Sequence, residues 1–262
     1  SVAAYEVLIN DYPNYESLSG KINGLNSIPK PDFNKEYSFP IASIYAFISV
    51  GKDLIFSENK INSFQEELLN EFQEKGVPKD ILNRSKEYGL EVANHIKKWY
   101  DEDNYKQTRS FPKYTIQRDI KESWKPTPPD YMEGIEPHWN KIRTLVVDSS
   151  NQFMIEPPPE FSLEKNSKFY KDLLEVYEIG NNLTEEQKNM ASFWDCNPYV
   201  SHHKGHAMFA TKKITPGGHW IGITKIVSKK ADLNLMETIY TYTMVSIGLF
   251  DAFIICWDEK WR

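Results

Sequence analysis

A lysine and a tryptophan near the C-terminal end are the residues with the clearest potential for chemistry. Trp257 and Lys260 are three residues apart in an apolar segment, so a helix would place them on one face. Both should then point towards whatever that helix buries. A lysine directed into a core needs an anionic partner, because an unpaired buried ammonium group is costly. The pair is therefore a candidate oxyanion site. The alternative interpretation is a lysine exposed to solvent at a helix end.

Three histidines, His202, His203 and His206, lie close together in the chain. On a helix, His202 and His206 would share a face and could bind a metal. No glutamate stands between them in the zinc-protease pattern, and Gly205 with its aromatic surroundings indicates a turn. We predict packing or hydrogen bonding for at least one of these histidines, and no metal site.

A second group of candidates surrounds a turn. Asn197-Pro198 predicts a turn that re-aims Tyr199. A tyrosine hydroxyl on a turn can donate a hydrogen bond into a cavity, so Tyr199 is a candidate site residue; the alternative is an aromatic side chain at the edge of the core. Asp251, a charge inside the apolar segment, favours structural pairing with an arginine or lysine over acid catalysis.

The segment from Thr215 to Trp220 predicts a helix start, with threonine at the N-cap and Pro216 at the first helical position. Free N–H groups at such a start favour an anion. The alternative is a well-capped core helix, with Trp220, Ile223, Ile226 and Val227 facing the core.

Helical periodicity runs through most of the chain. It predicts helices over residues 41–56, 59–74, 79–100, 165–177, 184–193 and from about 232 onward, after a helix-like start at 1–8. Thr184 and Gln187 predict a capping box. The last helix carries an apolar stripe at Met236, Ile239, Thr243, Ile247, Phe250, Ile254 and Trp257, so it should be central. No alternating strand pattern of useful length is visible. The sequence therefore predicts an all-α multi-helix bundle forming a single domain over 1–262.

The stretch 101–164 differs in character, because prolines cluster in it among aromatic residues. Such a stretch cannot be one helix, and it is too aromatic for a disordered linker. We predict a long ordered loop packed over the helices, a kind of segment that often carries function.

Composition excludes several classes of protein. The net charge of -6 argues against a nucleic-acid scaffold. The longest apolar run, residues 244–257, is interrupted by Asp251 and falls short of the roughly 20 residues of a membrane span. No Ser-His-Asp pattern, phosphate-binding loop, dinucleotide fingerprint or cysteine-rich zinc module is present. Cys196 and Cys256 leave open a disulfide or two free thiols.

Several motifs resemble the superfamily of vanadium-dependent haloperoxidases and type 2 phosphatidic acid phosphatases, in particular its bacterial iodide-oxidising branch. They are WKPTPPDY at 124–131, EPHW at 136–139, FWD at 193–195, FATKK at 209–213, PGGHW at 216–220, DA at 251–252 and WDEKW at 257–261. The resemblance covers the chain from about residue 120 onward, and more weakly from Ser1. The superfamily signature is K-x6-R-P, then P-S-G-H, then S-R-x5-H. Lys260 fits the opening lysine, and the other parts are not among the 262 residues.

The resemblance implies a bundle of the vanadium haloperoxidase type. This chain would be its N-terminal portion, truncated at both ends, with the remaining catalytic residues beyond Arg262. It implies vanadate as cofactor, with Lys260 binding its oxygens and Trp257 and Tyr199 beside it. Hydrogen peroxide and a halide, above all iodide, would be the substrates and hypohalous acid the product. It also implies a periplasmic or secreted bacterial protein, a monomer or homodimer.

Two other functions remain open. An acid phosphatase of the same superfamily would hydrolyse phosphate esters, with the histidine of the signature as nucleophile. A non-catalytic helical binding module would suit a chain that carries only the first residue of the signature. Vanadate-dependent iodide oxidation, vanadate-inhibited ester hydrolysis, or neither activity would separate the three.

Overall fold

The computed structural model describes residues 1–55, 58–128, 131–197, 199–204 and 207–262; the side chains of 199–204 and 208–212 lie outside the description. The chain divides into two compact units. Unit 1 comprises residues 1–111, 138–152 and 221–262. Unit 2 comprises residues 112–137 and 153–220.

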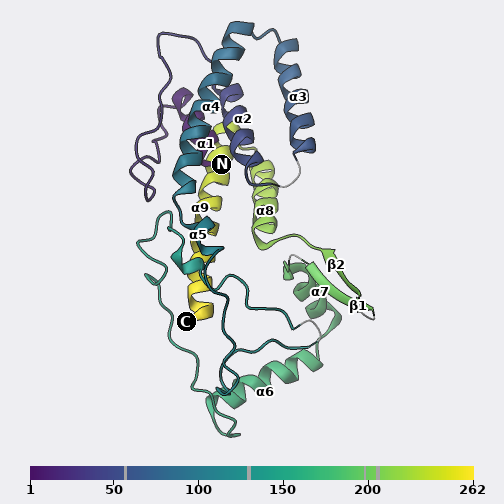
Figure 1. Cartoon of the computed structure of the whole chain (residues 1–262). Helices are drawn as coiled ribbons and strands as arrows, with labels where there is room; N and C mark the ends of the chain where they lie inside the picture. The colour runs from purple at the N-terminus through teal and green to yellow at the C-terminus, as the bar shows by residue number, and fades with distance from the viewer. Residues whose placement is uncertain (56–57, 129–130, 198, 205–206) are drawn as a thin grey trace. The chain divides into compact units, whose positions relative to one another are not determined.

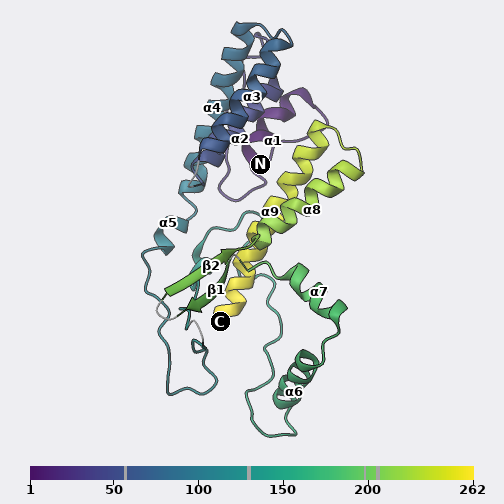
Figure 2. The same cartoon turned by 90° about the vertical axis from the view of Figure 1, so that its right-hand side faces the viewer.

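Unit 1 is helical (Figures 1 and 2). Its elements are α1 (Val2–Leu8), η1 (Ile9–Asp11), α2 (Phe39–Lys52), α3 (Asn59–Glu74), α4 (Lys79–Asp101), α5 (Tyr105–Thr108), the short 3-10 helix η2 (Trp139–Lys141), most of α8 (Pro216–Lys230) and α9 (Leu235–Trp261). The short helix α1 lies against α2, α4 and α9. The core forms there, from side chains such as Val7, Leu8, Leu25, Val92 and Met236.

Unit 2 contains two helices and a hairpin, besides the first turn of α8. They are α6 (Lys168–Asn181), α7 (Glu185–Trp194), β1 (Tyr199–Lys204) and β2 (Ala207–Lys212). The strands are antiparallel, with Tyr199 opposite Lys212 and Lys204 opposite Ala207. Every side chain of α6 and α7 is at least partly exposed, so this unit has little core of its own among the described residues.

The helix predictions are largely confirmed, and the all-α class is confirmed with them. The helix starts follow their capping signals: Thr184 and Gln187 form the predicted capping box, and Thr215 Oγ1 accepts a hydrogen bond from the backbone N–H of Gly218 at 3.0 Å. A second capping box, between Asn234 and Glu237, starts α9. Helix α9 thus begins three residues later than predicted, because its first capping residue is Asn234.

Three expectations need correction. The hairpin was not visible in the sequence, because its strands lack a clear alternation of apolar and polar residues. Trp220, Ile226 and Val227 are exposed, and α8 buries Thr224 and Ser228 instead. By length and composition, α9 is apolar enough to cross a membrane. Two of its aspartates, Asp251 and Asp258, are buried and accept hydrogen bonds from other residues of unit 1.

The crossing of α2 and α4 depends on a glycine. A Cβ atom at Gly89 would lie 2.2 Å from the carbonyl oxygen of Ala42, so the two helix backbones approach too closely for any larger residue. We expect Gly89→Ala to lower the free energy of unfolding by about 2 kcal/mol, since helix backbones must separate to relieve the clash. Thermal denaturation followed by circular dichroism measures this loss.

The control for this substitution is Gly248→Ala in α9. Gly248 is helical and exposed, and a Cβ atom there would meet nothing within 4 Å. Alanine at this position should stabilise the protein by about 0.5–1 kcal/mol through helix propensity. A Gly89→Ala variant that is as stable as Gly248→Ala would contradict the close crossing.

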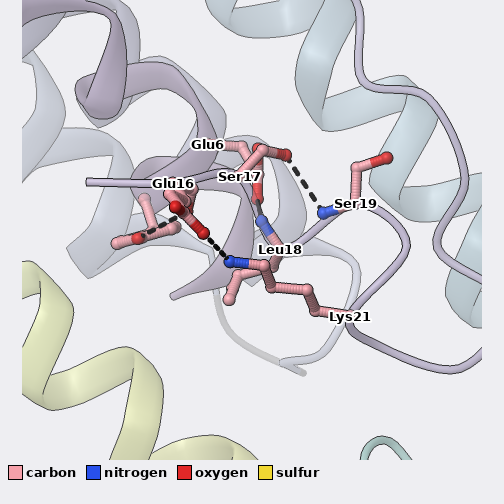
Figure 3. A network of polar contacts seen from close by, with 7 residues as sticks. Glu6, Glu16, Ser17, Leu18, Ser19 and Lys21 are labelled. Carbon is pink, nitrogen blue, oxygen red and sulfur yellow. Dashed lines mark hydrogen bonds and ion pairs between the residues drawn. The ribbon is translucent and has the colours of Figure 1, made fainter. Parts of the chain in front are cut away.

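A buried carboxylate ties α1 to the segment that follows it. Glu6 is only 2% exposed. Its oxygens accept hydrogen bonds from the hydroxyl of Ser17 and the backbone N–H of Leu18, both at 2.7 Å (Figure 3). Burial raises the pKa of Glu6, although the two hydrogen bonds act in the opposite direction. The folded state therefore holds the proton on Glu6 more tightly than the unfolded state does.

This shift predicts a pH dependence of stability. The contribution of Glu6 to the free energy of unfolding is fully present below its unfolded pKa and is lost as pH rises through the raised folded pKa. Glu6→Gln keeps an acceptor oxygen for Leu18, and its stability should not decline over this pH range. Melting temperatures measured from about pH 4 to 8 test it. Glu16→Gln is the control, because Lys21 lowers the pKa of Glu16 and its effect has the opposite sign. A decline that persists in Glu6→Gln would contradict the assignment.

Candidate functional site

The last turn of α9 brings the two leading candidates together. The Nζ atom of Lys260 lies 4.9 Å from the centroid of the Trp257 ring, in a cation–π contact. This confirms that the two side chains share one face of the helix. Lys260 itself is exposed, whereas the buried face at this end of α9 carries Ile254 and Asp258.

The prediction that Lys260 points into the buried side of α9 is therefore wrong for this chain. Asp258 is two residues, or more than half a helical turn, away from Lys260, so the two side chains leave α9 on different faces. Within the described residues, no carboxylate forms an ion pair with Lys260. Its charge is held over an indole ring at the surface, where the three N–H donors of an ammonium can reach an external anion.

Two further aromatic rings complete a cluster with Trp257. Trp139, from η2, packs on Trp257 with ring centroids 4.7 Å apart, and Phe253 lies 5.7 Å from Trp257 and 6.1 Å from Trp139. We call Trp139, Phe253 and Trp257 the aromatic cluster. The sequence pointed to Trp139 only as part of the EPHW motif at 136–139, and no role was predicted for it. The partnership joins residues over 100 positions apart, and no local periodicity signals such a contact.

A polar contact fixes η2 beside the aromatic cluster. The Nδ2 group of Asn140 donates a hydrogen bond to Oδ1 of buried Asp258 at 2.7 Å. Two polar atoms of η2 are buried without a partner in the described chain: Nε1 of Trp139 and Oδ1 of Asn140. Buried polar atoms normally have partners, so these two are exceptions.

Asp251 explains why η2 stays in place. Its carboxylate, 5% exposed, accepts hydrogen bonds from the backbone N–H groups of Leu145 at 2.6 Å, Val146 at 2.8 Å and Val147 at 3.1 Å. The predicted pairing with an arginine or lysine is wrong, because three successive backbone donors take that place. The prediction of a structural role is consistent with this geometry. Asp251 thus fastens the segment that follows η2 to the middle of α9.

Tyr199 stays a prediction. It opens β1 in unit 2, and its side chain, with those of His202 and His203, lies outside the description; His206 lies outside it altogether. In the part of the chain that the structure covers, no group of three or more metal-ligating residues is present.

The base of the hairpin is held by two contacts. Lys213 pairs with Asp195 and keeps the pKa of that carboxyl below its usual range. The next residue, Cys196, contacts the ring of His219. Both cysteines are free, which decides the alternative left open by the sequence.

Comparison with known proteins gives one informative result. No protein-family model and no curated protein matches the chain. A solved structure superposes over 100% of the chain with a TM-score of 0.90 and 46% sequence identity. The fold is accordingly that of the vanadium-dependent haloperoxidases, and the resemblance seen in the sequence motifs is confirmed. The matching protein is described as the first bacterial vanadium-dependent iodoperoxidase. The chain spans 61% of the length of that protein.

Proposed function

We propose that the intact protein containing this chain is a vanadium-dependent haloperoxidase that oxidises iodide with hydrogen peroxide. The observation that carries the proposal is the 46% identity to an iodoperoxidase over the whole chain. The Lys260–Trp257 pair supports it, because Lys260 fits the first position of the oxyanion-binding signature and its charge lies over an aromatic ring.

The residues around the end of α9 fit one side of an oxyanion site. Lys260 provides a positive charge with three N–H donors. Trp139 provides an indole N–H that is buried without a partner in the described chain. A tetrahedral oxyanion needs such donors around its oxygens. We propose that the other signature residues, Arg-Pro, Ser-Gly-His and the final Arg and His, come from the part of the intact protein that this chain does not include.

In this proposal each residue of the chain has a separate role. Vanadate, when bound, supplies the Lewis acid that activates peroxide. Lys260 offsets the negative charge of the oxyanion and of the peroxide oxygens. Trp257 holds the ammonium group in place by the cation–π contact. Trp257 offers a polarisable surface to a large halide such as iodide through dispersion contacts. The net reaction is iodide, hydrogen peroxide and a proton giving hypoiodous acid and water.

Reconstitution of the intact protein tests the function. The vanadium-free protein should not oxidise iodide with peroxide, and added vanadate should restore the activity. Absence of restoration would remove the haloperoxidase function. Hydrolysis of phosphate esters without vanadate, inhibited by vanadate, would establish the phosphatase alternative instead. Neither activity, in a protein that is folded by circular dichroism, would favour a binding module.

A further inference from the structure

A cysteine and a histidine in unit 2 form a pair that the proposed peroxidase chemistry does not use. The Sγ atom of Cys196 lies 2.8 Å from Nδ1 of His219. Both side chains are half-buried, so small molecules can reach them while most solvent is excluded. The two residues come from opposite sides of the hairpin, 23 positions apart.

The imidazole of His219 is held in a fixed orientation. It stacks on Trp194, with centroids 5.2 Å apart and planes 29° apart. The ring of Phe193 makes a T-shaped contact with it, with centroids 4.8 Å apart. His219 also lies in the first turn of α8, which Thr215 caps. A nucleophile, an adjacent base and groups that orient the base are the three parts of an activated cysteine.

The charged residue next to Cys196 in the chain has a partner of opposite charge. The carboxylate beside the pair, Asp195, is neutralised by Lys213. Cys256 is the second free cysteine of the chain and serves as a reference thiol. It is exposed on α9 and, within the described residues, makes no hydrogen bond to a histidine.

We propose that Cys196 is a peroxide-reactive thiol and that His219 is its base. The Cys196 thiol transfers its proton to Nδ1 of His219. The thiolate sulfur attacks one oxygen of hydrogen peroxide, so an S–O bond forms and the O–O bond breaks. The imidazolium returns its proton to the departing hydroxide, which leaves as water. Sulfur is oxidised to a sulfenic acid and the peroxide is reduced. This reaction needs neither vanadate nor halide, so it stands apart from the function proposed above.

The test compares the two cysteines in the same sample. The protein, free of vanadate and halide, is treated with hydrogen peroxide and dimedone, and adducts are quantified by peptide mass spectrometry. We expect Cys196 to form the adduct at least about 10-fold faster than Cys256, because an adjacent base increases the reactivity of a nucleophile. His219→Gln should reduce the rate at Cys196 to near that of Cys256. The matched control His138→Gln, a histidine of unit 1, should leave it unchanged. Equal rates at the two cysteines in the wild type would overturn the proposal.

A second measurement needs no variant and so does not depend on how His219→Gln folds. The rate of alkylation of Cys196 by iodoacetamide is followed from about pH 8 to 6, next to free N-acetylcysteine. The free thiol should slow about tenfold per pH unit over the lower part of this range. Cys196 should slow much less, because His219 lies within hydrogen-bond distance of its sulfur and can accept the proton as the thiol reacts. A Cys196 profile that parallels the free thiol would contradict the pairing.

Discussion

Replacing Lys260 with alanine is expected to weaken vanadate binding by the intact protein by about one to two orders of magnitude. The substitution removes the one charged donor that this chain contributes to the proposed oxyanion site. A hydrogen bond to a charged group contributes about 1.5–3 kcal/mol, and each 1.4 kcal/mol is a factor of about ten in affinity. The loss should therefore be about 10- to 100-fold, and isothermal titration calorimetry with vanadate measures it directly.

Two controls separate charge from folding in this experiment. Lys260 is exposed, so Lys260→Ala should leave the melting temperature nearly unchanged. His202→Ala should leave vanadate affinity unchanged, because the proposed site takes no ligand from His202. Lys260→Arg keeps the charge and should retain part of the affinity. Equal affinity in the wild type and in Lys260→Ala would remove Lys260 from the site.

Replacing Asp251 with alanine should cause the largest loss of stability of any substitution considered. The change leaves the N–H groups of Leu145, Val146 and Val147 without their acceptor. Each unsatisfied buried donor costs about 1–3 kcal/mol. We expect a loss of about 4 kcal/mol, since the half-exposed donors can recruit water. The midpoint of guanidinium-induced unfolding measures it.

Glu91→Ala is the matched control for Asp251→Ala. Glu91 is an exposed acidic residue within α4 of the same unit, so its removal should change the free energy of unfolding by less than about 0.5 kcal/mol. The near-ultraviolet circular dichroism of Asp251→Ala should also change, because Trp139 and Trp257 lose their fixed packing. An Asp251→Ala variant as stable as Glu91→Ala would show that the three backbone hydrogen bonds do not hold this segment.

Local signals in the sequence were sufficient for most of the helices. The capping box at Thr184 and the Thr215-Pro216 helix start were readable because they depend on residues within one turn. The apolar stripe of α9 likewise identified its buried face, including Met236, Thr243 and Ile247. These features arise from backbone geometry and periodicity, which a short window of sequence contains.

The contacts that build the candidate site were not predictable in the same way. Trp139 meets Trp257, Asn140 meets Asp258 and Asp251 meets Leu145 across more than 100 residues. Local patterning carries no information on such pairs. Asp251 was assigned a charged partner, because a lone buried carboxylate commonly pairs with a cation. Three consecutive backbone N–H groups satisfy it here, and their availability depends on the loop conformation.

Because Lys260 is exposed, the Lys260–Trp257 pair can bind an anion that comes from outside the chain. An ammonium group inside a core would already need an anion from the same chain. An ammonium group held over Trp257 at the surface keeps its donors available to a ligand. Trp139 packs against Trp257, and its indole N–H is buried without a partner in the described chain. The end of α9 is thus organised by Asp251, Asn140 and the aromatic cluster before any ligand arrives.

The most direct test of the proposed oxyanion site is a crystal structure of the intact protein with vanadate bound. We expect a vanadate oxygen within about 2.7–3.2 Å of Nζ of Lys260, the range of a hydrogen bond, with Trp257 still beside that ammonium group. Vanadate bound elsewhere, with Lys260 remaining in solvent, would contradict it.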